Sequence, residues 1–160
     1  MSNKILIAID PSSNALKAVK YAAGILKAES KVTLYHVFFK SPHLDLQEGE
    51  ILPHHPVSFS GSTDEFKKWL LSQRTAVEES LNAARKILIE GGLDPENIEF
   101  RIEEKKQGVA ADILNKVKEG GYDTVVVSRR GMSRVKRFFS GSVTTKIMHH
   151  AENCTVWIVE

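Results

Sequence analysis

The sequence predicts an α/β fold, a doubly wound open sheet of five parallel strands with helices on both faces. Short runs of apolar and β-branched residues alternate along the chain with longer segments in which apolar residues recur at helical spacing. Some of the short runs are continuously apolar, which is typical of strands covered on both faces. Strands that alternate with helices are joined by crossovers, and crossovers lead to parallel pairing.

The first strand is predicted over residues 4–9, which read Lys-Ile-Leu-Ile-Ala-Ile and end at Asp10. A Pro-Ser-Ser segment then favours a helix start, and apolar residues follow at helical spacing as far as Leu26. A second strand is predicted over residues 31–38, which are rich in Val, Thr, Tyr and Phe.

Residues 39–62 interrupt this rhythm, because they hold three prolines and two glycines without a sustained period. We expect a long loop or lid there, and loops beyond about 12–15 residues are often functional. The apolar stripe that follows predicts a long amphipathic helix over residues 63–90, which the Gly91-Gly92 pair ends.

The second half of the chain repeats the alternation. Residues 98–103 alternate apolar with charged side chains, which indicates an edge strand with one wet face. A helix is predicted from Gly108 to Gly120, and a fourth strand over residues 124–127. The last predicted elements are a helix over residues 141–150 and a strand over residues 155–159.

Length and composition indicate one soluble domain over residues 1–160, of ordinary globular composition with 42% hydrophobic and 26% charged residues. The net charge of +2 gives no global reason to expect nucleic acid or a membrane as a partner. The single cysteine, Cys154, excludes an internal disulfide. The first apolar run is too short for a signal peptide or a membrane span, so we expect a cytoplasmic protein.

Two strand ends carry residues suited to a ligand. Asp10 follows the first strand, Ser128 to Gly131 follow the fourth, and Gly141 and Ser142 then open a helix. Ligands of open parallel sheets bind beyond the carboxyl ends of strands, and a helix N-terminus attracts anions through its unpaired N–H groups.

In such a site Gly141 admits an anion close to the backbone, and Ser142 adds a hydroxyl donor, with Thr144 as a second. Gly131 permits a positive φ or a close approach at the strand exit. Asp10 has two roles open to it, accepting hydrogen bonds from ribose hydroxyls or capping the first helix. These residues predict a nucleotide or phosphate site.

The chain resembles the universal stress protein family along nearly its full length. The matching segments are residues 5–10, 34–37, Gly108 with residues 111–113, and residues 124–159 with their Ser-Arg-Arg-Gly, Gly-Ser-Val and Cys-Thr-Val-Trp-Ile-Val stretches. The resemblance implies a Rossmann-like fold of the adenine nucleotide alpha hydrolase-like kind.

ATP-binding members of that family carry Gly, two residues, Gly, nine residues, Gly, and then Ser or Thr. The second and third glycines match Gly131 and Gly141, and the hydroxyl residue matches Ser142. The first glycine is replaced by Ser128. If that position required a positive φ, a residue with a Cβ would cost about 1 kcal/mol there.

The resemblance implies bound ATP or another adenine nucleotide, with Mg²⁺ held through the phosphates. The backbone of Val37 would meet the adenine, Asp10 the ribose or base, and the glycine-containing loop the phosphates. The residues expected at the nucleotide are Asp10, Pro11, Val37, Ser128, Arg130, Gly131, Gly141, Ser142, Val143 and Thr144. The resemblance also implies a homodimer paired through Thr155 to Val159, and an apolar edge strand needs such a partner.

Three functions remain open. The first is an ATP-binding stress-response or signalling homodimer with at most slow ATP hydrolysis. The second is a dimeric protein-interaction module without nucleotide, in which residues 39–62 form the partner surface. The third is a nucleotide-dependent enzyme of the related α/β superfamily, for which we identify no general base and no P-loop lysine.

Other chemistry has weaker sequence support. The basic cluster of residues 129–137 favours phosphate contact over nucleic acid, because no aromatic platform accompanies it. Adjacent histidines at 54–55 and 149–150 do not face one metal easily, so we expect no metal site. Cys154 opens an apolar strand and is interpreted as a small buried side chain without a catalytic role.

Overall fold

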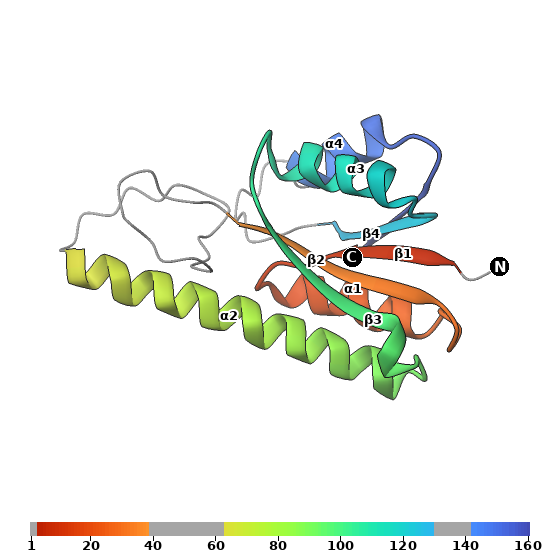
Figure 1. Ribbon diagram of the computed structural model, residues 1–160, viewed down its shortest axis with the longest axis horizontal. Coiled ribbons are helices and arrows are strands. Elements are labelled where there is room, and N and C mark those ends of the chain that lie inside the picture. The colour runs from red at the N-terminus through yellow and green to blue at the C-terminus, as the bar shows by residue number, and fades with distance from the viewer. Residues whose placement is uncertain (1–2, 39–62, 130–141) are drawn as a thin grey trace.

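The predicted fold class is confirmed. The computed structural model describes residues 3–38, 63–129 and 142–160. Five parallel strands form one sheet in the order β3-β2-β1-β4-β5 (Figure 1). The strands are β1 (Lys4–Ala8), β2 (Lys31–Phe38), β3 (Ile98–Glu104), β4 (Thr124–Ser128) and β5 (Thr155–Val159).

The helices occupy the predicted segments. They are α1 (Ser13–Ala23), α2 (Thr63–Glu90), α3 (Val109–Gly120) and α4 (Ser142–His150), with a short 3-10 helix η1 (Pro95–Asn97) that the sequence did not indicate. No helix in the described ranges is long and apolar enough to cross a membrane. The loop or lid expected over residues 39–62 lies outside the described residues.

Helices cover the sheet on both faces, with α1 and α2 on one side and α3 and α4 on the other (Figure 1). Residues of β1 alternate between the two hydrophobic clusters, so that Ile5 and Ile7 face α1 and α2 whereas Leu6 faces α3 and α4. All three are buried. This double burial explains why β1 is continuously apolar, since each fully buried aliphatic side chain contributes about 1.5–3 kcal/mol.

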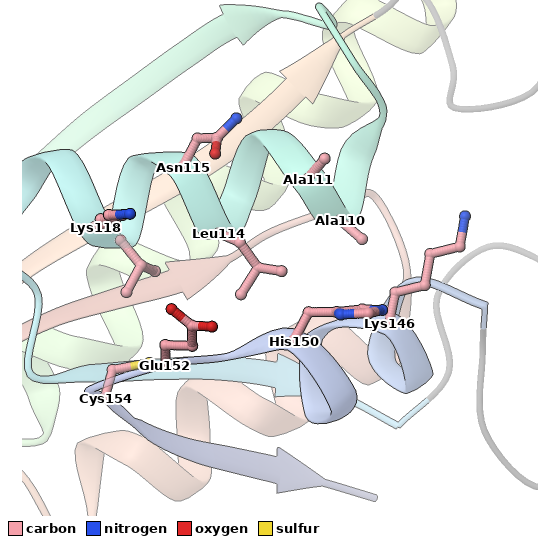
Figure 2. Close-up of a pocket in the computed structure, with 10 residues that line it drawn as sticks. Ala110, Ala111, Leu114, Asn115, Lys118, Lys146, His150, Glu152 and Cys154 are labelled. Atoms are coloured by element: carbon pink, nitrogen blue, oxygen red, sulfur yellow. The ribbon is translucent and has the colours of Figure 1, made fainter.

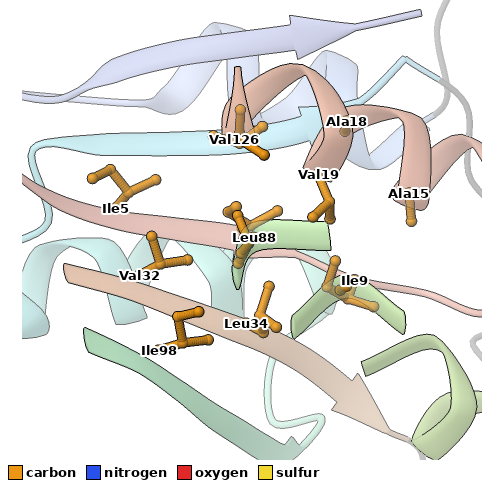
Figure 3. Packing of buried hydrophobic residues seen from close by; sticks show 14 of the residues in the cluster. Ile5, Ile9, Ala15, Ala18, Val19, Val32, Leu34, Leu88, Ile98 and Val126 are labelled. Carbon is orange, nitrogen blue, oxygen red and sulfur yellow. The ribbon is translucent and has the colours of Figure 1, made fainter. Parts of the chain in front are cut away.

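The larger cluster lies beneath α1 and α2 (Figure 3). Helix α1 presents small residues such as Ala18 and Ala22 to the sheet, which lets its backbone approach closely. From Val77 onward, α2 buries one stripe that includes Leu81 and Leu88. The helical spacing of these residues in the sequence therefore marks the buried face.

Strand β3 is an edge strand, as predicted, but it is exposed to solvent on both faces. Ile98 is buried, whereas Phe100 and Ile102, on the same face, are 39% and 38% exposed. The reason is that α2 packs chiefly against α1 and β2, which leaves the outer part of β3 uncovered.

A polar network joins β2, β3 and α3. The Tyr35 hydroxyl donates to Glu103 Oε2 over 3.1 Å, and Lys116 forms an ion pair with the same carboxylate. Burial by itself would raise the pKa of Glu103, but Lys116 and the Tyr35 hydroxyl outweigh it and hold that pKa below its ordinary value. Glu103 thus binds this edge of the sheet to α3.

The end of α2 meets the end of α1 at a glycine, which yields a testable prediction. A Cβ at Gly91 would lie 2.8 Å from the Cβ of Ala23, whereas a Cβ at Gly24 would meet nothing closer than a carbonyl oxygen at 3.5 Å. We expect Gly91→Ala to lower the free energy of unfolding by about 1–3 kcal/mol through overpacking. Gly24→Ala should change it by less than about 1 kcal/mol, because Gly24 has a right-handed helical backbone.

Urea denaturation of both variants measures the difference. Equal stability of the Gly91→Ala and Gly24→Ala proteins would contradict the close contact between the two helix ends.

Candidate functional site

The strand order reverses between β1 and β4. From β1 the chain passes through α1 to β2 on one side, whereas β4 leads through α4 to β5 on the other side. The helices that follow these neighbouring strands therefore leave on opposite faces of the sheet (Figure 1). Such a switch point opens a crevice beyond the carboxyl ends of the two strands, where ligands of this fold class bind.

Asp10 lies on the β1 side of the crevice and organises the start of α1. Its Oδ1 accepts hydrogen bonds from the Ser12 backbone N–H over 3.0 Å and from the Ser12 hydroxyl. Ser12 is the N-cap residue of α1, because its Oγ accepts from Ala15 N over 3.2 Å. The cap is thus Ser12, with Asp10 as its support. No residue in the described ranges donates to Asp10 Oδ2, and Asp10 and Pro11 are both half-buried.

The carboxyl end of β2 projects past β1. The ladder between β1 and β2 ends at Tyr35, whereas β2 pairs with β3 as far as Phe38. The side chain of Val37 is buried towards α3 and α4, so only its backbone is available to a ligand at this edge. The backbone role expected for Val37 stays a prediction.

His36 joins the ends of β1 and β2. Its Nδ1–H donates to the carbonyl oxygen of Ile9 over 2.7 Å, and the side chain is buried. Burial lowers the pKa of His36, an effect that the bond to Ile9 and the charge of Asp10 only partly offset. His36 is therefore a neutral ring that holds the loop carrying Asp10 in place.

A buried hydrogen bond fixes α4 to the end of β4. The Thr144 hydroxyl donates to the carbonyl oxygen of Ser128 over 2.8 Å, and both residues are buried. The first turn of α4 is therefore held at the crevice, beside the end of the strand. In this arrangement the Thr144 hydroxyl positions the helix.

Ser128 occupies its position in the glycine pattern without backbone strain. It is the last residue of β4, and Asn153 is the only described residue other than glycine with a positive φ. The cost of about 1 kcal/mol that a left-handed backbone would impose on a residue with a Cβ therefore does not arise.

Arg129 follows directly and connects β4 to β5. Its backbone N–H donates to the carbonyl oxygen of Val159 over 2.7 Å, and its guanidinium forms an ion pair with Glu160. The sequence placed Arg129 in a basic cluster but gave no signal for Glu160, because their 31-residue separation carries no pattern.

Part of the expected phosphate side can be placed. Ser142 and Val143 open α4, and Val143 is half-buried against the cluster under α3 and α4. Arg130, Gly131 and Gly141 lie outside the described residues. The N-terminus of α4 offers its N–H groups and the positive end of its dipole, which suit an anion, and a carboxylate on β1 suits hydroxyl donors.

A separate groove lies between α3 and α4, with a volume of about 430 Å³ (Figure 2). None of the expected site residues that the structure describes is among its lining residues. Its lining residues are Ala110, Ala111, Leu114, Asn115, Val117, Lys118, Lys146, His150, Glu152 and Cys154.

Burial raises the pKa of the Cys154 thiol, which keeps it protonated and a poor nucleophile. Within the described part of the chain, no group of three His, Cys, Asp or Glu side chains is arranged to hold a metal ion.

The protein is a doubly wound α/β protein. At its switch point the Asp10 carboxylate follows β1, and the N-terminus of α4 is bonded to the end of β4. The family model of the Universal stress protein family matches residues 1–160. The chain belongs to the universal stress protein family.

Curated relatives of similar length support this membership. The chain is 29% identical over 158 residues to universal stress protein Sll1388 of Synechocystis sp., covering 98% of this chain and 97% of the relative. It is also 29% identical over 162 residues to universal stress protein YxiE of Bacillus subtilis, covering 99% of both.

Solved structures share the fold. UspA from Lactobacillus plantarum has a TM-score of 0.71 at 16% identity, covering 99% of this chain and 97% of that one. A universal stress protein in complex with cAMP has a TM-score of 0.69 at 19% identity, with coverages of 99% and 97%. A family member from Arabidopsis thaliana with AMP bound has a TM-score of 0.61 at 19% identity, with coverages of 98% and 90%.

The buried neutral state of His36 predicts a pH dependence of stability. The pKa of His36 is lowered from 6.5 in the folded chain, so below pH 6.5 the unfolded chain binds a proton that the folded chain does not. The contribution of His36 to the free energy of unfolding is therefore fully present above pH 6.5. It falls as the pH drops below that value, by up to about 1.4 kcal/mol for the first pH unit.

Urea unfolding at pH 7.5 and 5.5 measures this loss. We expect His36→Gln to lose less stability between the two pH values than the wild type, and His149→Gln, at an exposed histidine, to lose as much as the wild type. An unchanged loss in His36→Gln would show that the dependence arises elsewhere.

Proposed function

We propose that this protein binds an adenine nucleotide, ATP with Mg²⁺, in the crevice between β1 and β4, and acts as a homodimeric stress-response or signalling protein. The observation that carries the proposal is that Asp10 follows β1 and the first turn of α4 is bonded to the end of β4, the two neighbouring strands of the switch point. A nucleotide needs both an acceptor for its hydroxyls and a site for its phosphates.

The described residues fit the parts of such a ligand. Asp10 uses Oδ1 to support Ser12, which leaves Oδ2 to accept from a ribose hydroxyl. The backbone of Val37 projects beyond β1, where it meets the adenine. The phosphates lie at the N-terminus of α4, beside Ser142 and Val143, with Arg130, Gly131 and Gly141 completing their surroundings.

The relatives support an adenine ligand. Two of the solved family structures carry cAMP and AMP, and a third, from Archaeoglobus fulgidus, is a complex with dAMP. The adenine base is common to all three ligands. We assign ATP to this chain from the two retained glycines of the ATP-binding pattern and from the unstrained backbone of Ser128.

We expect at most slow hydrolysis of the nucleotide. The described residues around the crevice include no group placed as a general base at the phosphates, since Asp10 is assigned to the ribose and the His36 ring is buried on Ile9. Mg²⁺ would reach the site bound to the phosphates, because it keeps most of its water and prefers few protein ligands.

We assign the dimer interface to β5. This strand is an edge of the sheet with half-buried Val156 and Trp157 and exposed Ile158, and the Trp157 ring packs edge-to-face on Tyr21 with centroids 6.4 Å apart. An apolar edge strand that carries unpaired backbone groups is stabilised by pairing with a second copy.

The ligand proposal is tested by calorimetric titration of the nucleotide-free protein with ATP and Mg²⁺. We expect saturable binding by the wild type and affinity at least about tenfold lower in Asp10→Asn, because a hydrogen bond to a charged carboxylate is lost. Asp94→Asn is the matched control, since Asp94 Oδ1 accepts a similar backbone bond, from Glu96 N over 2.9 Å, before η1. Absence of binding by the wild type at millimolar ATP would refute the proposal.

The proposed interface is tested by two separate substitutions, each of one exposed isoleucine on an edge strand. Ile158 on β5 is 41% exposed, and Ile102 on β3 is 38% exposed. We expect Ile158→Glu to weaken dimerisation at least about tenfold, because it buries a charge at the seam, and Ile102→Glu to leave it unchanged. Sedimentation velocity gives the dissociation constants, and equal effects of the two variants would place the interface elsewhere.

A further inference from the structure

The carboxylate of Asp10 offers a ligand one oxygen rather than two. Its Oδ1 accepts from two donors of Ser12, the backbone N–H over 3.0 Å and the hydroxyl. A carboxylate oxygen has two lone pairs, so these two donors fill the acceptor capacity of Oδ1. Since no described residue donates to Oδ2, that oxygen is the one left for a sugar hydroxyl.

We propose that Ser12 limits sugar recognition in the crevice to a single hydroxyl, so that the site takes ATP and either of its monodeoxy forms with similar affinity. The inference rests on the proposed function, in which Asp10 meets the ribose. It assigns Ser12 as a positioning residue, which determines sugar selectivity through the carboxylate of Asp10.

The main chain that carries Asp10 is fixed on both sides of the preceding residue. The Ile9 N–H donates to the carbonyl oxygen of Tyr35 over 2.8 Å, and the Ile9 carbonyl oxygen accepts from Nδ1 of His36 over 2.7 Å. Ile9, Tyr35 and His36 are all buried. The carboxylate of Asp10 can therefore turn only by side-chain rotation, and its two bonds to Ser12 oppose that rotation.

The Ser12 hydroxyl is itself held by the helix. As the N-cap of α1, its oxygen accepts from Ala15 N over 3.2 Å, which directs the hydroxyl hydrogen to the carboxylate. A hydrogen bond from a hydroxyl to an ionised carboxylate is roughly twice as strong as one between neutral groups. A ligand hydroxyl therefore binds Oδ2 and leaves Ser12 on Oδ1.

A single acceptor oxygen distinguishes poorly between the two hydroxyls of ribose. The 2′ and 3′ hydroxyls are neighbours on the ring, and a carboxylate with two free oxygens accepts from paired donors side by side, as it does from a guanidinium. One free oxygen needs only one of the two donors. Loss of either hydroxyl is thus tolerated, whereas loss of both leaves Oδ2 unpaired in the complex.

Calorimetric titration of the wild type with the Mg²⁺ complexes of ATP, 2′-deoxy-ATP, 3′-deoxy-ATP and 2′,3′-dideoxy-ATP tests the inference. We expect both monodeoxy nucleotides to bind within about threefold of ATP, and the dideoxy nucleotide to bind at least about tenfold more weakly. A tenfold loss for either monodeoxy nucleotide, or no loss for the dideoxy nucleotide, would overturn the inference while leaving the nucleotide site intact.

Two substitutions of Ser12 test its role. Ser12→Gly returns an acceptor position to Oδ1, so we expect the preference for ATP over the monodeoxy nucleotides to rise to at least about fivefold. Ser12→Thr is the matched control, because it retains the hydroxyl, and its preference should stay within about threefold. Each preference is a ratio of affinities measured on one protein, which the small loss of helix capping in Ser12→Gly leaves unchanged.

An equal preference in Ser12→Gly and Ser12→Thr would overturn the assignment of Ser12. Failure of the wild type to bind any of the four nucleotides would overturn the inference and the proposed function together.

Discussion

The parallel pairing of β1 with β2 on one side and with β4 on the other is the constraint on which the rest of the structure depends. Ile5, Leu6 and Ile7 each pair in register with both neighbours, so β1 has no free edge. Both of its faces are also covered, which removes all three side chains from water. The chain adds β2 and β3 on one side of β1 and then crosses to the other side to add β4 and β5. The crevice between β1 and β4 follows from this change of side.

Polar contacts then determine how the strand ends are held at the crevice. His36 ties the end of β2 to Ile9, and Thr144 ties α4 to Ser128. Both bonds are buried, where an unmade hydrogen bond costs far more than at the surface. The proposed site is thus presented by a rigid frame, while its carboxylate, Asp10, remains half-buried.

The two edges of the sheet differ in a way that bears on assembly. Strand β3 carries Glu99, Arg101 and Glu103, and charged side chains on an edge strand disfavour pairing with another chain. Strand β5 consists of Thr, Val, Trp, Ile and Val. The charge pattern therefore favours β5 over β3 as the edge for the proposed self-association.

The sequence by itself determined the element types, their order and the parallel class of the sheet, because apolar periodicity and glycine positions are local signals. It also indicated Asp10, the Ser128 segment and the start of α4 as candidate site residues, since each follows a predicted strand or opens a predicted helix. The exposure of Phe100 and Ile102 was not predictable, because it depends on where α2 packs.

Only the tertiary structure decided which side chains meet. It made Ser12 the cap and Asp10 its support, joined Thr144 to Ser128, and paired Arg129 with Glu160. It also showed that Ser128 replaces a glycine without strain, because the residue lies in an extended strand. The physical reason is sequence separation. Thr144 and Ser128 are 16 positions apart and Arg129 and Glu160 are 31 apart, and local propensities carry no information over such distances.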